Sequence, residues 1–198
     1  MLGFFKKHAD KLRYYDAVTG MSKITRRYFV MNSFDGALTM FGLLLGSYSA
    51  NVQDPLLIIH IGLGTSIAIS FSGLTGAFMT ERAERAREIR AMERALHRKL
   101  DNTDYKKAYE FASFITGVVD GASPLLAALV LLSPFLLFPL PDAYYMSFGL
   151  ALGVFFFLGT YLGRISRESL VLNGLRFLGA GILCLIVILL VENMSSVV

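Results

Sequence analysis

The sequence predicts an all-α polytopic membrane protein with five transmembrane helices. Of its 198 residues 55% are hydrophobic and only 17% are charged, whereas soluble domains carry about 25% charged residues. The charges are also concentrated in a few segments, which leaves long runs without any. A membrane-spanning helix needs about 20 mainly apolar residues. Five runs are long enough, and they cover residues 28–50, 55–80, 112–137, 143–163 and 170–191.

The boundaries between these runs carry residues that end helices. Residues 51–54 (NVQD) and 138–142 (FPLPD) are predicted to be tight turns, since Pro and Asp commonly interrupt helices. The third run contains Pro124 and Pro134, and proline lacks the N–H that an inner helical turn requires. We therefore expect a kink or an early end in that helix.

The distribution of lysine and arginine predicts the orientation. Of the 19 lysines and arginines, all but Arg176 precede residue 28, lie between the second and third runs, or lie between the fourth and fifth. With five spans, all three of these segments fall on one side of the membrane. The positive-inside rule makes that side the cytosol. We expect a cytosolic N-terminus, an external C-terminus and, given the short chain, a prokaryotic plasma membrane.

The start of the first predicted span divides the chain into two regions. Residues 1–27 place Phe4, Phe5, Leu12, Tyr15 and Val18 among charged residues, which is typical of an amphipathic helix lying on the inner leaflet. A frayed basic tail is the alternative. Residues 28–198 form the transmembrane domain, in which the second helix is expected to extend into the cytosol, with a cytosolic charged helix at 81–108.

Two acidic residues lie within predicted spans. Asp35 lies about 10 Å into the first span at 1.5 Å per residue, with Asn32 one turn before it on the same face. Asp120 lies in the third span, and Pro124 has no N–H to donate to its carbonyl oxygen, so we expect that oxygen to accept from water or an ion. A buried acid is costly, which makes function the default interpretation and a structural hydrogen bond the alternative. The two acids are expected either to share a cation or proton path or to lie far apart.

The charged extension carries a stripe of glutamates. Glu81, Glu84 and Glu88 are spaced i, i+3 and i+7, which aligns them on one helix face. Such carboxylates suit Mn²⁺ or Fe²⁺, with Glu93, Met79 and Met92 nearby on the chain. The alternative is a solvated helix of ion pairs, because each glutamate has an arginine three or four residues away.

Other chemistry has little support in the sequence. No Walker loop, dinucleotide fingerprint or HExxH motif is present, so we expect neither an enzyme nor a tightly bound cofactor. The single cysteine, Cys184, excludes a disulfide within the chain. The charge pattern favours lipid over nucleic acid as a partner. His60 and His97 are isolated, and Arg176 is expected to extend back to the headgroups or to pair with Asp35 or Asp120.

The motifs together resemble the vacuolar iron transporter family. The run from Arg27 to Gly36, followed by Phe41 and Gly46, is similar to that family's first helix. Further similarities extend over nearly the whole chain: Ser72, Gly76 and Phe78 in the second span, Gly121, Ala122 and Pro124 in the third, and Gly159, Gly163, Gly174 and Gly179 in the last two. The resemblance implies a homodimer that exports Fe²⁺ or Mn²⁺ from the cytosol in exchange for protons. It also implies that Asp35 lies in the translocation path and that Glu81, Glu84, Glu88 and Glu93 collect the metal.

The chain departs from that family in its second helix. The family pattern Ser-Met-x-x-Gly-Glu reads Ser-Gly-Leu-Thr-Gly-Ala at residues 72–77, so the intramembrane Met and Glu are absent. Asp120 is the acid expected to compensate, at a position that is usually apolar in the family. Two other interpretations remain open, namely a non-transporting scaffold or sensor whose charged helix docks a partner, and a channel or a transporter of another cation.

Overall fold

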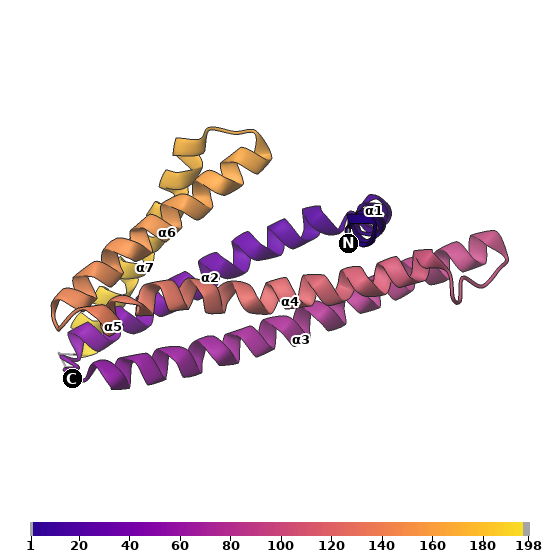
Figure 1. Cartoon of the computed structure of the whole chain (residues 1–198). Coiled ribbons are helices and arrows are strands. Elements are labelled where there is room, and N and C mark those ends of the chain that lie inside the picture. The colour runs from indigo at the N-terminus through magenta and orange to yellow at the C-terminus, as the bar shows by residue number, and fades with distance from the viewer. Residues whose placement is uncertain (1, 196–198) are drawn as a thin grey trace. The chain divides into compact units, whose positions relative to one another are not determined.

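The structure is a computed structural model that describes residues 2–195 and, of these, the side chains of residues 9–191. Every regular element in that part of the chain is a helix (Figure 1). The helices are α1 (Leu2–Thr19), α2 (Met21–Ser49), α3 (Pro55–Leu96), α4 (Asp104–Leu132), α5 (Pro134–Leu137), α6 (Asp142–Ser166) and α7 (Leu170–Ser195). Five segments are long and apolar enough to cross a membrane, and α4 and α5 together form the third. The predicted fold class is confirmed.

The helices differ from the predicted spans mainly where polar residues continue a helix. α3 runs without interruption from Pro55 to Leu96, as the absence of Gly and Pro after residue 80 predicts. α4 begins at Asp104, ahead of the apolar run expected from residue 112, because hydropathy does not detect a polar first turn. Between them the chain turns through His97 and Asn102, both at positive φ. The charged segment 81–108 is therefore a helical hairpin, and the prediction of one continuous helix there is wrong.

The two prolines of the third span act differently. α4 continues through Pro124 but ends at Leu132, and Pro134 begins the short helix α5. The predicted early end is thus observed at Pro134. A proline at the first position of a helix costs little, because the N–H that it lacks has no partner there in any case.

The chain divides into two compact units. The first combines Met1–Phe29 with Phe71–Ala122, and α1 packs in it through the Tyr15 ring, whose centroid lies 5.5 Å from that of Phe111. The turn from α1 to α2 passes through Gly20 at φ +61°, a conformation that glycine adopts without strain. α1 is helical as predicted, and its contact with a membrane stays a prediction. The side chains of Phe4 and Phe5 lie outside the described residues.

Asp16 stabilises the start of α2 in this unit. Its carboxylate accepts hydrogen bonds from the Ser22 backbone N–H at 2.6 Å and from the Ser22 hydroxyl at 2.9 Å. The bond from the backbone, followed by that from the hydroxyl, lowers the pKa of Asp16. An acceptor at this place satisfies one of the N–H groups that the first helical turn leaves without a partner.

The second unit combines Val30–Ser70 with Ser123–Val198 and holds an extended apolar core. α2 contributes Ala37, Met40, Phe41 and Leu44, which are buried and recur at helical spacing. They meet buried residues of α4 and α6, and the fully buried Phe155 ring lies 5.7 Å from that of Phe41. α2 also approaches Pro124 at Gly36, where an added Cβ would lie 2.4 Å from the proline Cα.

α6 carries two pairs of glycines spaced four residues apart, a pattern common at helix contacts in membranes, but only one pair makes such a contact among the residues that the structure describes. Against α7, a Cβ on Gly159 would lie 2.4 Å from the carbonyl oxygen of Asn173, and one on Gly163 would lie 3.1 Å from the Asn173 amide nitrogen. By contrast, Gly149 and Gly153, on the same helix, have no heavy atom within 4 Å of such a Cβ among the described residues. Four-residue spacing alone therefore does not identify a contact.

These two environments give a matched test on α6. Gly159→Ala places a methyl group against the α7 backbone, which must then shift, and overpacking of this kind costs about 1–3 kcal/mol. Gly153→Ala adds the same group in open space and should leave stability unchanged or slightly higher. We expect thermal unfolding in detergent micelles to show a lower midpoint only for Gly159→Ala. Equal midpoints for the two variants would contradict this helix contact.

Candidate functional site

Asp120 is the predicted acid that the structure buries. It lies on α4 in the first unit, and only 4% of its surface is exposed. The carboxylate lies against α3 at Gly73, where an added Cβ would be 2.7 Å from Oδ2. The same two helices meet at Gly117, where a Cβ would be 2.9 Å from Cβ of Phe78. Small residues on both helices thus bring the backbones together and leave room for the carboxylate.

Asp35 has a different environment, in the second unit. Its neighbours Gly36 and Ala37 are buried on α2, whereas Asp35 itself is exposed and points away from that unit's core. Asn32, one turn earlier, is half-buried. An acid on the outside of an apolar helix needs water, a proton, an ion or another protein segment to offset its cost in a membrane.

Glu81 of the glutamate stripe forms an ion pair, and the nearby Glu93 accepts a backbone hydrogen bond. The Glu81 carboxylate lies 3.3 Å from Nε of Arg85 and accepts a long hydrogen bond of 3.4 Å from the Tyr28 hydroxyl. The carboxylate of Glu93 accepts the backbone N–H of Leu100 at 2.9 Å, which closes the turn after α3. Two of the predicted metal ligands therefore already have partners within the protein.

The remaining predicted ligands are dispersed. Glu84, Glu88 and Met79 are exposed, and Met92 is half-buried. His60 and His97 are also exposed, and Nδ1 of His60 lies 2.7 Å from the Leu56 carbonyl oxygen of its own helix. Within the described part of the chain, no three acidic, histidine or cysteine side chains are grouped so that they could hold a metal ion.

The sequence did not lead us to predict a buried arginine beside Glu81 in the first unit, but Arg85 is one. Only 5% of Arg85 is exposed, and its guanidinium lies over the ring of Tyr109, 5.3 Å from the centroid. Nearby, Lys106 donates to Asp101 at 2.6 Å, and this hydrogen bond lowers the pKa of Asp101. A feature of the sequence that could have indicated a buried partner for Arg85 is Tyr109, an aromatic residue in the polar stretch before the third apolar run.

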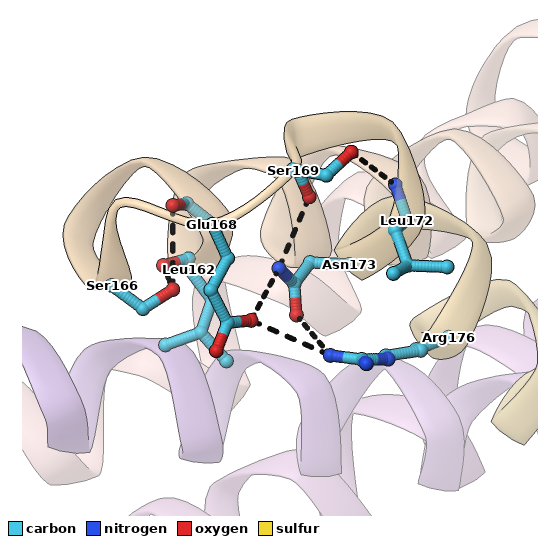
Figure 2. Close-up of polar contacts among 8 residues, drawn as sticks. Leu162, Ser166, Glu168, Ser169, Leu172, Asn173 and Arg176 are labelled. Carbon is cyan, nitrogen blue, oxygen red and sulfur yellow. Dashed lines mark hydrogen bonds and ion pairs between the residues drawn. The ribbon is translucent and has the colours of Figure 1, made fainter.

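Arg176 takes local partners in the second unit. Figure 2 shows it at the turn between α6 and α7, where its guanidinium donates to the carboxylate of Glu168 at 3.4 Å and to the side-chain oxygen of Asn173 at 3.2 Å. The amide of Asn173 also donates to Glu168 at 2.9 Å and to the Ser169 carbonyl at 3.1 Å. These contacts close the α6–α7 turn.

The architecture and the comparisons together define the class of protein. Five apolar helices of spanning length make the chain a polytopic all-α membrane protein. It belongs to the same family as the uncharacterized protein MJ0645 of Methanocaldococcus jannaschii, with which it is 31% identical over 171 residues, covering 84% of this chain and 88% of that protein. No family model and no solved structure matches the chain.

The pair formed by Arg85 and Glu81 gives a prediction on stability. Removing one member of a buried ion pair leaves the other charge without compensation and costs about 3–5 kcal/mol, whereas replacing both is often neutral. We expect Arg85→Leu to destabilise the protein strongly in detergent micelles, and Arg85→Leu combined with Glu81→Leu to recover most of the loss.

The exposed pair of Lys107 and Asp104, whose nearest charged atoms are 4.0 Å apart, provides the control. Lys107→Leu should change the free energy of unfolding by less than about 1 kcal/mol. If Arg85→Leu costs no more than Lys107→Leu, the buried pair does not contribute to the stability of the protein.

Proposed function

We propose that the protein exports a divalent metal cation, Fe²⁺ or Mn²⁺, from the cytosol in exchange for protons. The observation that carries this proposal is the burial of Asp120 against α3 within a membrane-spanning helix. A carboxylate in this setting costs several kcal/mol unless it is protonated, hydrated or bound to a cation. Alternation between a proton and a metal ion at one acid is the elementary step of an antiporter.

Gly73 supports a role for Asp120 in place of the acid that the second helix lacks. In the resemblance to the vacuolar iron transporters, Gly73 stands where that family has methionine, and Ala77 stands where it has glutamate. The space made by the missing methionine side chain is the space beside the Asp120 carboxylate. Moving the acid from α3 to α4 would therefore preserve a carboxylate at this helix contact.

Asp35, with Asn32, is the second candidate on the path of the ion. Its exposure on α2 leaves the carboxylate accessible to an ion, to a proton or to a second copy of the chain in the homodimer that the resemblance implies. With the basic segments in the cytosol, Glu84 and Glu88 lie on the cytosolic part of α3. Because both are exposed, we assign them a diffuse attraction for cations, and we assign Glu81 and Glu93 a mainly structural role.

Proton-coupled transport predicts a specific loss in two variants. Asp120→Asn and Asp35→Asn should each reduce Mn²⁺-stimulated proton movement in proteoliposomes to background, because an amide neither releases a proton nor neutralises the metal charge. Asp10→Asn, a matched change at an exposed residue of α1, should leave that flux unchanged. Wild-type flux in Asp120→Asn, with normal folding by size-exclusion chromatography, would remove Asp120 from the mechanism.

A second candidate function is a scaffold or sensor without transport, whose charged helical hairpin docks a partner. The pairing of Glu81 with Arg85 and of Glu93 with the Leu100 N–H favours it, because carboxylates that already have partners within the protein form a rigid stalk. Calorimetry with Mn²⁺ distinguishes the two functions. A transporter should give saturable heat that Asp120→Asn removes, whereas a scaffold should give none. A simple channel would continue to conduct after the proton gradient is collapsed.

A further inference from the structure

We propose that the first unit binds the phosphate headgroup of an anionic phospholipid in a cavity between the end of α3 and the start of α4. This inference does not depend on the transport function. It rests on the lining of the cavity, on the state of a buried arginine in its wall, and on an apolar hollow that adjoins it.

The cavity has a volume of about 360 Å³, at the small end of the roughly 300–1,000 Å³ typical of ligand pockets. Its size therefore suits a headgroup better than a large soluble ligand. Three acidic residues line it, and they are outnumbered by five basic ones, Arg82, Arg85, Arg90, Lys99 and Lys106.

Two of the three acids already accept hydrogen bonds from the protein. Asp101 accepts from Lys106 at 2.6 Å, and Glu93 accepts from the Leu100 N–H at 2.9 Å. These bonds do not change the balance of charge, since the Leu100 N–H is neutral and the pair of Lys106 and Asp101 holds one charge of each sign, so the excess of basic residues leaves the wall net positive. A phosphate group, which takes charge-assisted hydrogen bonds from arginine and lysine, matches this balance.

Arg85 is a preorganised donor in the wall of the cavity. The Tyr109 ring and the Glu81 carboxylate hold its guanidinium, and the residue is 95% buried, since 5% is exposed. Among the described residues, its Nη2 has no hydrogen-bond acceptor. A buried N–H group without an acceptor costs free energy, which a phosphate oxygen of a bound headgroup would recover.

A second hollow indicates that the phosphate belongs to a lipid. It has a volume of about 400 Å³, shares Arg82, Glu110 and Ser113 with the first cavity, and adds Phe78 and Phe114. Arg82 is the first basic residue after the apolar part of α3, which places the junction of the two hollows at headgroup depth. Basic pockets at this depth on the cytoplasmic side commonly hold lipid headgroups, and the phenylalanines provide a surface for an acyl chain.

Glu110 narrows the choice of headgroup. It lines both hollows, and an ionised carboxylate accepts hydrogen bonds but donates none. A headgroup that carries hydroxyl groups beside its phosphate, as phosphatidylglycerol does, satisfies both Glu110 and the arginines. A headgroup that ends in a quaternary amine has no hydrogen to donate to Glu110 and bears no net negative charge.

Titration of the full chain in neutral detergent micelles with dioctanoyl phosphatidylglycerol tests the proposal. Native mass spectrometry and calorimetry should show one saturable site per chain, and dioctanoyl phosphatidylcholine should show none. Arg82→Gln and Arg90→Gln should each weaken binding about tenfold, the loss expected for one charge-assisted hydrogen bond. Arg87→Gln removes the same charge from an exposed position on the same helix that does not line the cavity, so binding should change less than about twofold.

The contribution of the apolar hollow is measured separately. Phe114→Ser should weaken binding of dioctanoyl phosphatidylglycerol and leave binding of inorganic phosphate unchanged. If inorganic phosphate binds as tightly as the lipid and Phe114→Ser changes neither, the site takes a soluble phosphate and the lipid proposal is overturned. Absence of saturable binding of either probe, or equal losses for Arg87→Gln and Arg82→Gln, would overturn the site itself. Both arms are independent of transport, so loss of flux in other variants does not affect them.

Discussion

The close approach of α3 and α4 around Asp120 is the contact on which the proposed chemistry depends. In hydrocarbon there is no hydrophobic force to drive helices together, so packing and polar contacts must do so. Gly73 and Gly117 let the two backbones approach, and Asp120 occupies the space that a larger residue at position 73 would fill. The glycine and the acid therefore depend on each other. A side chain at 73 would displace the carboxylate, and an apolar residue at 120 would leave the contact without its polar member.

In the second unit, glycines also allow helices to approach each other closely. Gly36 packs on Pro124, and Gly159 packs on the backbone of α7 beside Asn173. Pro124 in α4 has no N–H for a helical hydrogen bond, and the glycine opposite allows α2 to approach the proline closely. At the α6–α7 turn, Asn173 and Arg176 share the Glu168 carboxylate, which offsets the burial of the amide. In both units, a polar side chain (Asp120 in the first and Asn173 in the second) lies at a helix contact where the opposite residue is a glycine.

These contacts show how far the sequence alone could lead. The length of an apolar run and the positions of charged residues can be read from the chain without knowing what packs against it. The five spanning helices and the uninterrupted α3 were therefore predictable. The start of α4 at Asp104 was not, since Tyr105 and Tyr109 are amphipathic rather than apolar. Nor could the sequence predict which side chains contact each other. Glu81 and Glu84 look equivalent along the chain, but only Glu81 faces Arg85 and Tyr28. Likewise Gly153 and Gly159 differ only in what lies opposite.

The charge of the hairpin bears on how a cation would reach the membrane. Residues 81–108 hold nine lysines and arginines against six acids. Of these acids, Glu81, Glu93, Asp101 and Asp104 already have partners within the protein. A segment with this excess repels divalent cations over about the Debye length of 8–10 Å. An anionic headgroup in the cavity would neutralise part of the excess and leave Glu84 and Glu88, both exposed, as the dominant charges on their face of α3. A singly charged headgroup would lower the net charge of residues 81–108 from +3 to +2 and so weaken the repulsion of a metal ion at this end of α3. On this argument, the arginines from which the orientation is predicted are compatible with the proposed cation export only when anionic lipid supplies compensating charge.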